Sequence, residues 1–165
     1  MQISIIGYKG QGVKTLSRIL SRAGLLAGMI SEDFSESGNI VKAYVRIDKQ
    51  QMLEKGPIKN ADFMIVLDHS LFSSKEVKEN ITYIINALEK PKALAKEKNI
   101  HALEASEIAF KNTGKGIPNT PIAGALTKYY TKIQLKHIKQ AIEIELSKKQ
   151  KENCLAAEEG LKVVR

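Results

Sequence analysis

The stretch QISIIGYKGQGVKT, residues 2–15, contains a short apolar run, a glycine-rich turn and the start of an amphipathic segment. Gln2–Ile6 is apolar and rich in β-branched residues, which indicates a buried strand. From Val13 onward, apolar residues recur at helical spacing until Gly28, where a helix would end. A strand and a helix joined by a tight turn are typical of the opening unit of an α/β fold.

The rest of the chain continues the alternation of strand and helix. Further strands are predicted at Met29–Phe34, Ile40–Ile47, Ala61–Asp68, Ile81–Ile85 and Ile100–Leu103, and helices at Leu88–Lys98, Glu104–Lys111, Ile122–Tyr130, Leu135–Leu146 and Leu155–Leu161. The turn-rich Ser35–Asn39 could close a hairpin, and Asn112–Pro121 is expected to be a loop because two glycines and two prolines interrupt it. We expect residues 1–165 to form a single α/β domain, a three-layer α/β/α, Rossmann-like arrangement with a mostly parallel sheet and C-terminal helices.

Composition excludes several classes of site. The 165 residues are 43% apolar and 27% charged, as in ordinary soluble domains. Cys154 is the only cysteine, so the chain by itself can form no disulfide, no four-cysteine zinc site and no iron–sulfur cluster. No apolar run approaches the ~20 residues of a membrane span, and the first residues do not resemble a signal peptide. We therefore expect a cytoplasmic protein without membrane association.

The net charge of +8 favours a nucleic acid, an anionic ligand or an acidic partner. Aromatic residues make up only 5% of the chain, and tryptophan is absent. Single-strand binding surfaces need stacked aromatic side chains among their basic residues. We therefore expect no nucleic-acid partner, which leaves an anionic ligand or an acidic protein.

The glycine-rich turn Gly7–Gly12 lies where a strand leads into a helix. Backbone N–H groups at a helix N-terminus lack partners within the helix, and the helix dipole is positive there, so the geometry suits anions. Lys9 and Lys14 would add positive charge. The structural alternative is that a tight strand-to-helix turn needs glycine for steric reasons alone.

Two nucleotide-binding patterns are incomplete here. Lys9 and Val13 stand where a dinucleotide fingerprint requires its second and third glycines. Gly7–Thr15 is a Walker A pattern with one residue inserted before the lysine, and Asp68 ends a strand as a Walker B aspartate would. The insertion turns Lys14 by about 100° on the helix. A P-loop-like enzyme is thus one alternative, and a stand-alone anion-binding module is another.

The remaining polar residues do not form a recognisable catalytic or metal site. His69, His101 and His137 are dispersed, which argues against a metal site. Asp68 and His69 would lie at the carboxyl edge of the sheet, where ligands bind in such folds. Cys154 is interpreted as a packed residue, and the lysines between residues 128 and 151 mostly as a solvated helix face.

Several segments, taken in order, resemble a known family. They are Gly10-Gln11-Gly12-Val13, Val45-Arg46-Ile47, Gly56-Pro57-Ile58, Ala61-Asp62, Pro118-Asn119-Thr120, Gly124-Ala125, and Asn153 followed by Gly160. In order and spacing they are similar to the gamma subunit of 2-oxoacid:ferredoxin oxidoreductases, over nearly the whole chain. Lys9 departs from that pattern, because the family usually has a small residue there.

The resemblance implies a noncatalytic subunit of a larger enzyme. Alpha, beta and delta-type partner subunits would carry thiamine diphosphate with Mg²⁺ and iron–sulfur clusters, and the complex would convert a 2-oxoacid and coenzyme A to acyl-CoA and CO₂ while reducing ferredoxin. The isolated chain would be inactive, with no catalytic residue and no metal of its own. The resemblance implies coenzyme A binding nearby, at Gly10, Gln11, Gly12, Asn119 and Thr120. We expect Lys9, which departs from the family pattern, to add an ammonium group beside a phosphate of this cofactor.

Overall fold

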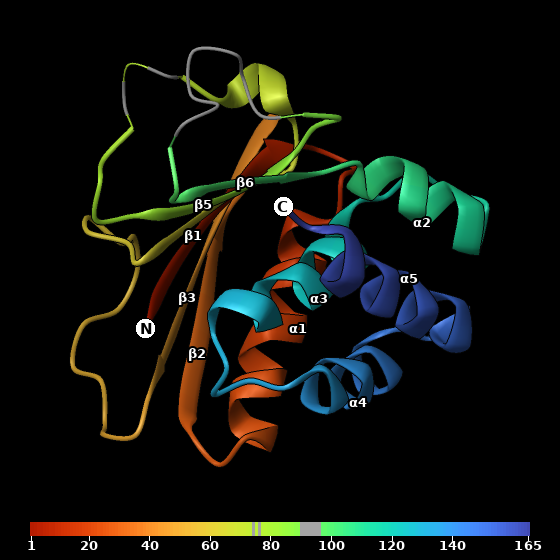
Figure 1. The fold of residues 1–165 in the computed structure, drawn as a ribbon. Coiled ribbons are helices and arrows are strands. Elements are labelled where there is room, and N and C mark those ends of the chain that lie inside the picture. The colour runs from red at the N-terminus through yellow and green to blue at the C-terminus, as the bar shows by residue number, and fades with distance from the viewer. Residues whose placement is uncertain (74, 76, 90–96) are drawn as a thin grey trace.

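A six-stranded sheet forms the centre of the computed structural model, which describes residues 1–73, 75, 77–89 and 97–165 (Figure 1). The strands are β1 (Gln2–Tyr8), β2 (Ile30–Glu36), β3 (Ile40–Asp48), β4 (Phe63–Val66), β5 (Thr82–Asn86) and β6 (Ile100–Leu103), in the order β2-β3-β1-β4-β5-β6. β1, β4, β5 and β6 run parallel, whereas β3 is antiparallel to both of its neighbours. The predicted α/β class with a mostly parallel sheet is confirmed.

The antiparallel pair β2–β3 is a hairpin. Ile30 pairs with Asp48 at one end, and Glu36 pairs with Lys42 beside the turn. The turn is built of Ser37, Gly38 and Asn39, which favour tight turns. The suggested hairpin is therefore confirmed, and its turn lies beside the carboxyl end of β1, because Tyr8 pairs with Ile40.

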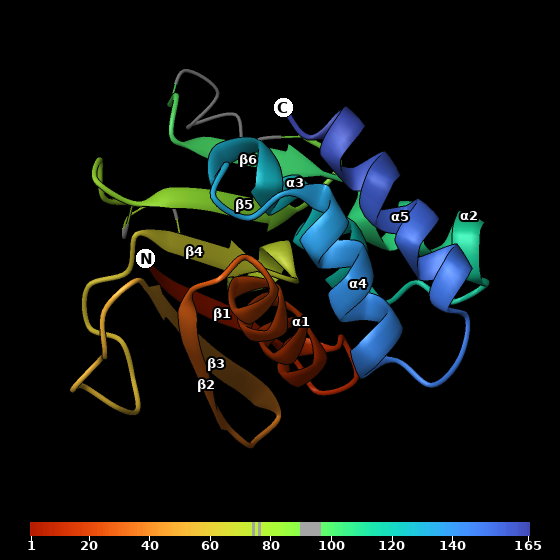
Figure 2. The same ribbon diagram turned by 90° about the horizontal axis from the view of Figure 1, so that it is seen from below.

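The described α-helices cover one face of the sheet (Figure 2). They are α1 (Val13–Leu26), α2 (Ala105–Thr113), α3 (Asn119–Tyr129), α4 (Leu135–Glu145) and α5 (Gln150–Val163). Ile3, Ile5 and Ile65 point from the sheet into the main core, which contains buried side chains from all five helices. A smaller core around Val66, Tyr83 and Ile85 lies on the opposite face, because successive strand side chains alternate between faces.

Residues after β4 cover that opposite face in the described part of the chain. The short 3₁₀ helix His69–Leu71 follows β4, and Leu71 and Phe72 pack on the smaller core. The helix predicted at Leu88–Lys98 lies mostly outside the described residues. No helix among those described is long and apolar enough to span a membrane.

One predicted boundary is wrong in a way that matters for the site. Asn112–Pro121 is not a loop throughout, since α2 extends to Thr113 and α3 begins at Asn119. Pro121 lies in the first turn of α3, where its missing N–H would have had no partner within the helix. Asn119 and Thr120 are consequently held on a helix.

Candidate functional site

The glycine-rich turn has the backbone shape that its sequence suggested. The Gln11 N–H donates to the Tyr8 carbonyl at 3.1 Å, and Gly10 between them has a φ of 96°. Gly12, with a φ of 80°, directly precedes α1. Both values lie in the left-handed region that favours glycine. The Lys9 N–H donates to the Asn39 carbonyl at 2.9 Å, which ties the turn to the hairpin.

The N-terminus of α1 is open to a ligand. Within the described part of the chain no side chain caps this end, and its first turn contains no acidic residue. The Gly12 carbonyl accepts from the Leu16 N–H at 2.8 Å, so the N–H groups of the first turn lack partners within the helix. Such an end attracts anions.

The Gln11 side chain links the glycine-rich turn to Asp68, just after the end of the neighbouring strand β4. Its Oε1 accepts from the Tyr8 N–H at 2.8 Å, and its Nε2 donates to Asp68 Oδ2 at 2.9 Å. Asp68 also accepts from the Ser70 hydroxyl at 2.7 Å and from the Ser70 N–H at 3.1 Å. Burial raises the pKa of the Asp68 carboxyl, but these donors outweigh burial and lower the pKa below its ordinary value. Gln11 therefore fixes the shape of the turn.

A cavity of about 1030 Å³ opens in front of the turn. We call it the lysine-lined cavity. The residues that line it are Tyr8, Lys9, Gly10, Gly12, Val13, Lys14, Thr15, Ser37, Gly38, Asn39, Val41, Thr113, Lys115, Ile117, Asn119, Leu146, Ser147, Lys148, Lys149 and Asn153. Five of these described residues are lysines, and none is an aspartate or a glutamate. The positive charge of the cavity lining is thus not compensated by a carboxylate among them, which favours an anionic ligand.

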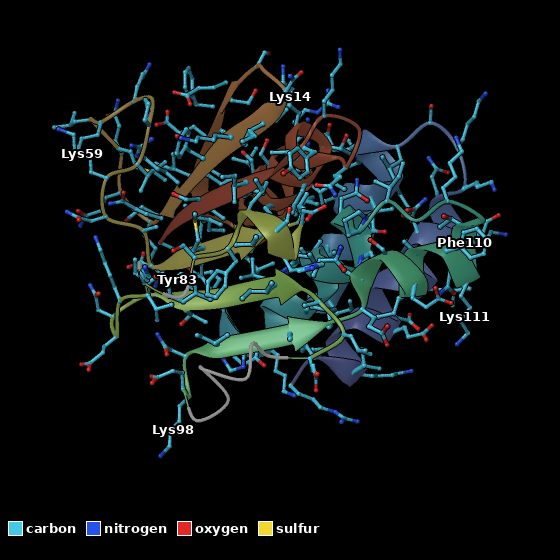
Figure 3. All side chains as sticks on the ribbon, turned by 90° about the horizontal axis from the view of Figure 1, so that it is seen from above. Lys14, Lys59, Tyr83, Lys98, Phe110 and Lys111 are labelled. Carbon is cyan, nitrogen blue, oxygen red and sulfur yellow. The ribbon has the colours of Figure 1, made fainter. Side chains whose placement is uncertain are left out.

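Four segments distant in sequence surround the lysine-lined cavity. The glycine-rich turn lies between the tip of the β2–β3 hairpin and the loop that joins α4 to α5 (Figures 2 and 3). Lys14, labelled in Figure 3, lies beside the hairpin tip and donates to Ser37 Oγ at 2.6 Å. The loop between α2 and α3 contributes Lys115 and Ile117.

Asn119 meets the glycine-rich turn directly. It is 6% exposed and lines the cavity, and its Oδ1 accepts from the Thr120 N–H at 2.9 Å. A Cβ at Gly12 would lie 2.6 Å from Asn119 Nδ2. The structure therefore brings together two of the predicted site residues that lie more than a hundred positions apart.

Thr120 does not line the cavity. Its side chain is fully buried, and its hydroxyl donates to Asn153 Oδ1 at 3.0 Å. Asn153 lines the cavity and donates from Nδ2 to the Lys149 carbonyl at 2.8 Å. Thr120 thus acts on the cavity only through Asn153, which the sequence interpretation did not select as a ligand contact.

The sequence interpretation also missed the lysines of two loops. Lys148 and Lys149 were grouped with a solvated helix face, yet they line the cavity together with Lys115. Lys149 has a φ of 52° and donates from its ammonium to the Thr113 carbonyl, which joins the start of α5 to the end of α2. A non-glycine residue with positive φ is uncommon, but neither this backbone conformation nor the contact is visible in the sequence.

The other expected residues take structural positions. Asp68 is hydrogen-bonded to Gln11 and Ser70 and is not part of the lining that contains Thr15, whereas a P-loop places the Walker B aspartate and the Ser/Thr at one Mg²⁺ site. Cys154 is buried, and burial raises the pKa of its thiol. No three His, Cys, Asp or Glu side chains among the described residues are grouped to hold a metal ion.

The chain is similar to known proteins over nearly its whole length. Residues 2–163 match the family model described as pyruvate ferredoxin/flavodoxin oxidoreductase. The chain is 29% identical over 155 residues to pyruvate synthase subunit PorC of Thermotoga maritima, which covers 87% of this chain and 81% of that one. It is 31% identical over 159 residues to the common subunit gamma of the pyruvate/ketoisovalerate oxidoreductases of Pyrococcus abyssi, with coverages of 87% and 85%.

A solved structure extends the similarity to the fold. The crystal structure of the Thermotoga maritima subunit matches with a TM-score of 0.85 at 27% identity, over 100% of this chain and 97% of that one. The family model spans both the glycine-rich turn and the α3–α5 pair that carries Asn153. The chain therefore belongs to the pyruvate ferredoxin/flavodoxin oxidoreductase family, as a gamma subunit of a multisubunit 2-oxoacid:ferredoxin oxidoreductase.

Proposed function

We propose that the lysine-lined cavity forms part of the coenzyme A site of the assembled oxidoreductase. The observation that carries this proposal is the cavity lining, which contains five lysines and no carboxylate in the described chain and surrounds an uncapped helix N-terminus. Coenzyme A carries a diphosphate and a phosphate monoester, and it must reach a catalytic centre on another subunit. Phosphate groups bind well to amide groups at helix N-termini and to nearby ammonium groups.

Each predicted site residue has a defined part in this proposal. The amides of Gly10 and Gly12 and the ammonium of Lys9 bind a phosphate, because all three residues line the cavity. Asn119 supplies a polar side chain beside them. Gln11 and Thr120 are positioning residues, since Gln11 braces the turn and Thr120 holds Asn153.

The redox and decarboxylation chemistry is proposed to belong to alpha, beta and delta-type subunits. This chain does not fit an iron–sulfur cluster, because one cysteine cannot supply its ligands. Its described residues also offer no three-ligand group for Mg²⁺ beside a thiamine diphosphate. We propose that the partner subunits hold these groups and pass electrons to ferredoxin, that this chain orients coenzyme A and excludes water, and that the isolated chain turns over no substrate.

Replacing Lys9 tests the proposal in the assembled complex. Lys9→Ala removes one charge-assisted contact of ~1.5–3 kcal/mol, so the KM for coenzyme A should rise by about tenfold or more. The KM for the 2-oxoacid and kcat should change little, since Lys9 is remote from the reacting carbons in this proposal. Steady-state kinetics with a viologen dye as acceptor measure all three constants.

Lys59→Ala is the matched control, because Lys59 is exposed, lies away from Lys14 (Figure 3) and is not part of the cavity lining. It removes the same charge without touching the cavity. Equal coenzyme A constants for the Lys9 and Lys59 variants would refute a role for Lys9.

A further inference from the structure

The lysine-lined cavity has two cationic sides. Lys9 lies on the hairpin side, because its N–H is bonded to the Asn39 carbonyl at 2.9 Å. Lys115 and Lys148 line the cavity from the α2–α3 and α4–α5 loops. The two loops lie on the other side of the glycine-rich turn from the hairpin (Figure 3). The contact of the Lys149 ammonium with the Thr113 carbonyl links the end of α2, which precedes one loop, to the start of α5, which follows the other.

The five lysines differ in whether their ammonium groups are already engaged. Lys14 donates to Ser37 Oγ at 2.6 Å, and Lys149 donates to the Thr113 carbonyl. In contrast, the ammonium groups of Lys9, Lys115 and Lys148 make no hydrogen bond or ion pair within residues 1–73, 75, 77–89 and 97–165. The hairpin side therefore offers one ammonium group to a ligand, and the loop side offers two.

The cavity has room for a ligand with more than one anionic group. The cavity volume of about 1030 Å³ lies at the upper end for small-molecule and cofactor sites. A ligand that engages both sides needs two anionic groups separated by an uncharged part. Coenzyme A has this arrangement, since its ribose separates the diphosphate on the 5′ side from the monoester on the 3′ side.

We infer that Lys115 and Lys148 bind the 3′-phosphate of coenzyme A, while Lys9 and the glycine-rich turn bind its diphosphate. This inference rests on the proposed function. The diphosphate is assigned to the turn because a helix N-terminus with exposed amides suits a pyrophosphate. The monoester carries about −1.5 to −2 charges at neutral pH, which matches two available ammonium groups. Lys115 and Lys148 thus distinguish coenzyme A from its analogue without the 3′-phosphate.

The experiment compares coenzyme A with dephospho-coenzyme A as substrates of the assembled complex. For Lys115→Ala and Lys148→Ala, the KM for coenzyme A should rise about tenfold, as expected for one lost charge-assisted contact. The KM for dephospho-coenzyme A should stay unchanged, because this analogue lacks the group that these lysines bind. Lys9→Ala should raise both constants by the same factor, and Lys148→Arg should retain most of the preference for coenzyme A.

The controls separate binding from assembly and from net charge. Lys59→Ala should leave both constants as in the wild type, and co-purification of the partner subunits should be equal for all variants. The inference is overturned if the wild-type complex does not prefer coenzyme A to dephospho-coenzyme A. It is also overturned if Lys9→Ala raises both KM values but the Lys115 and Lys148 variants change the two KM values equally or change neither. If no lysine variant changes either constant, the proposed function itself is refuted.

Discussion

Two pairs of glycines in this molecule serve different purposes. Gly10 and Gly12 in the turn have φ values of 96° and 80°, and a Cβ at Gly10 would meet no atom within 4 Å. Gly124 in α3 and Gly160 in α5 have no such backbone requirement, but a Cβ there would lie 1.9 Å from the Ala157 carbonyl oxygen and 2.0 Å from the Pro121 carbonyl oxygen, respectively.

The two pairs of glycines are therefore needed for different reasons, one for backbone conformation and the other for the room between two helices. The turn needs glycine because its backbone is left-handed, whereas the α3–α5 pair needs glycine because the two helix backbones nearly touch. Each glycine of that pair faces the backbone of the opposite helix, so the contact is reciprocal. This close approach lets the Thr120 hydroxyl reach Asn153 and thereby sets the cavity wall. The wall of the cavity at Asn153 therefore depends on the contact between α3 and α5.

The largest expected effect comes from filling the α3–α5 contact. Gly124→Ala places a Cβ against the Ala157 backbone, which cannot move without separating the helices. Overpacking typically costs about 1–3 kcal/mol and occasionally more, and we expect the upper end here because the obstructing atoms are helix backbone. We expect a much lower urea midpoint and poor recovery of the assembled complex. Gly116→Ala is the control, since its Cβ would lie 3.5 Å from the Ser106 carbonyl oxygen in ordinary contact. Similar urea midpoints for the two variants would show that the contact between α3 and α5 does not require glycine at position 124.

A smaller effect distinguishes the two glycines of the turn. Gly10→Ala should cost only the left-handed conformation, about 1 kcal/mol. Gly12→Ala should cost this and also displace Asn119, whose Nδ2 would lie 2.6 Å from the new Cβ. We expect Gly12→Ala to lower stability more and to raise the KM for coenzyme A more, as measured by denaturation and steady-state kinetics. Equal results for both variants would mean that space plays no part in the turn.

The smallest effect is a change in acid stability through Asp68. Because the pKa of Asp68 is lowered in the folded state, the carboxylate stabilises the fold above its unfolded pKa, and this contribution is lost as the pH falls through the folded pKa. Gln11→Ala removes one of the donors that lower this pKa. The pKa of Asp68 should rise, and acid unfolding should begin at a higher pH than in the wild type. Carboxyl ¹³C NMR titration measures the pKa, and an unchanged value would show that Ser70 alone sets it.

Much of the fold was predictable from local patterns. The continuous apolar runs of β1 and β4, and the helical spacing after Val13, require only neighbouring residues to be recognised. The start of α3 was misplaced because Pro121 indicates a break in the sequence but is tolerated in a first helical turn. The candidate site was predictable only in part. Glycine-rich turns have a local signature, but the approach of Lys115, Lys148 and Asn153 to that turn does not.

The sequence alone determined the α/β class, the strand–turn–helix unit at residues 2–26, and the lack of a cluster site in this chain, since one cysteine cannot supply the ligands of a cluster. Only the tertiary structure decided which lysines surround the cavity, why Thr120 acts through Asn153, and why Gly124 and Gly160 are glycines. The two groups of features differ in how far apart in the sequence the interacting residues lie. Backbone conformation and hydrophobic periodicity are properties of a few adjacent residues, whereas charge convergence and the distance between two helices arise when distant segments pack together.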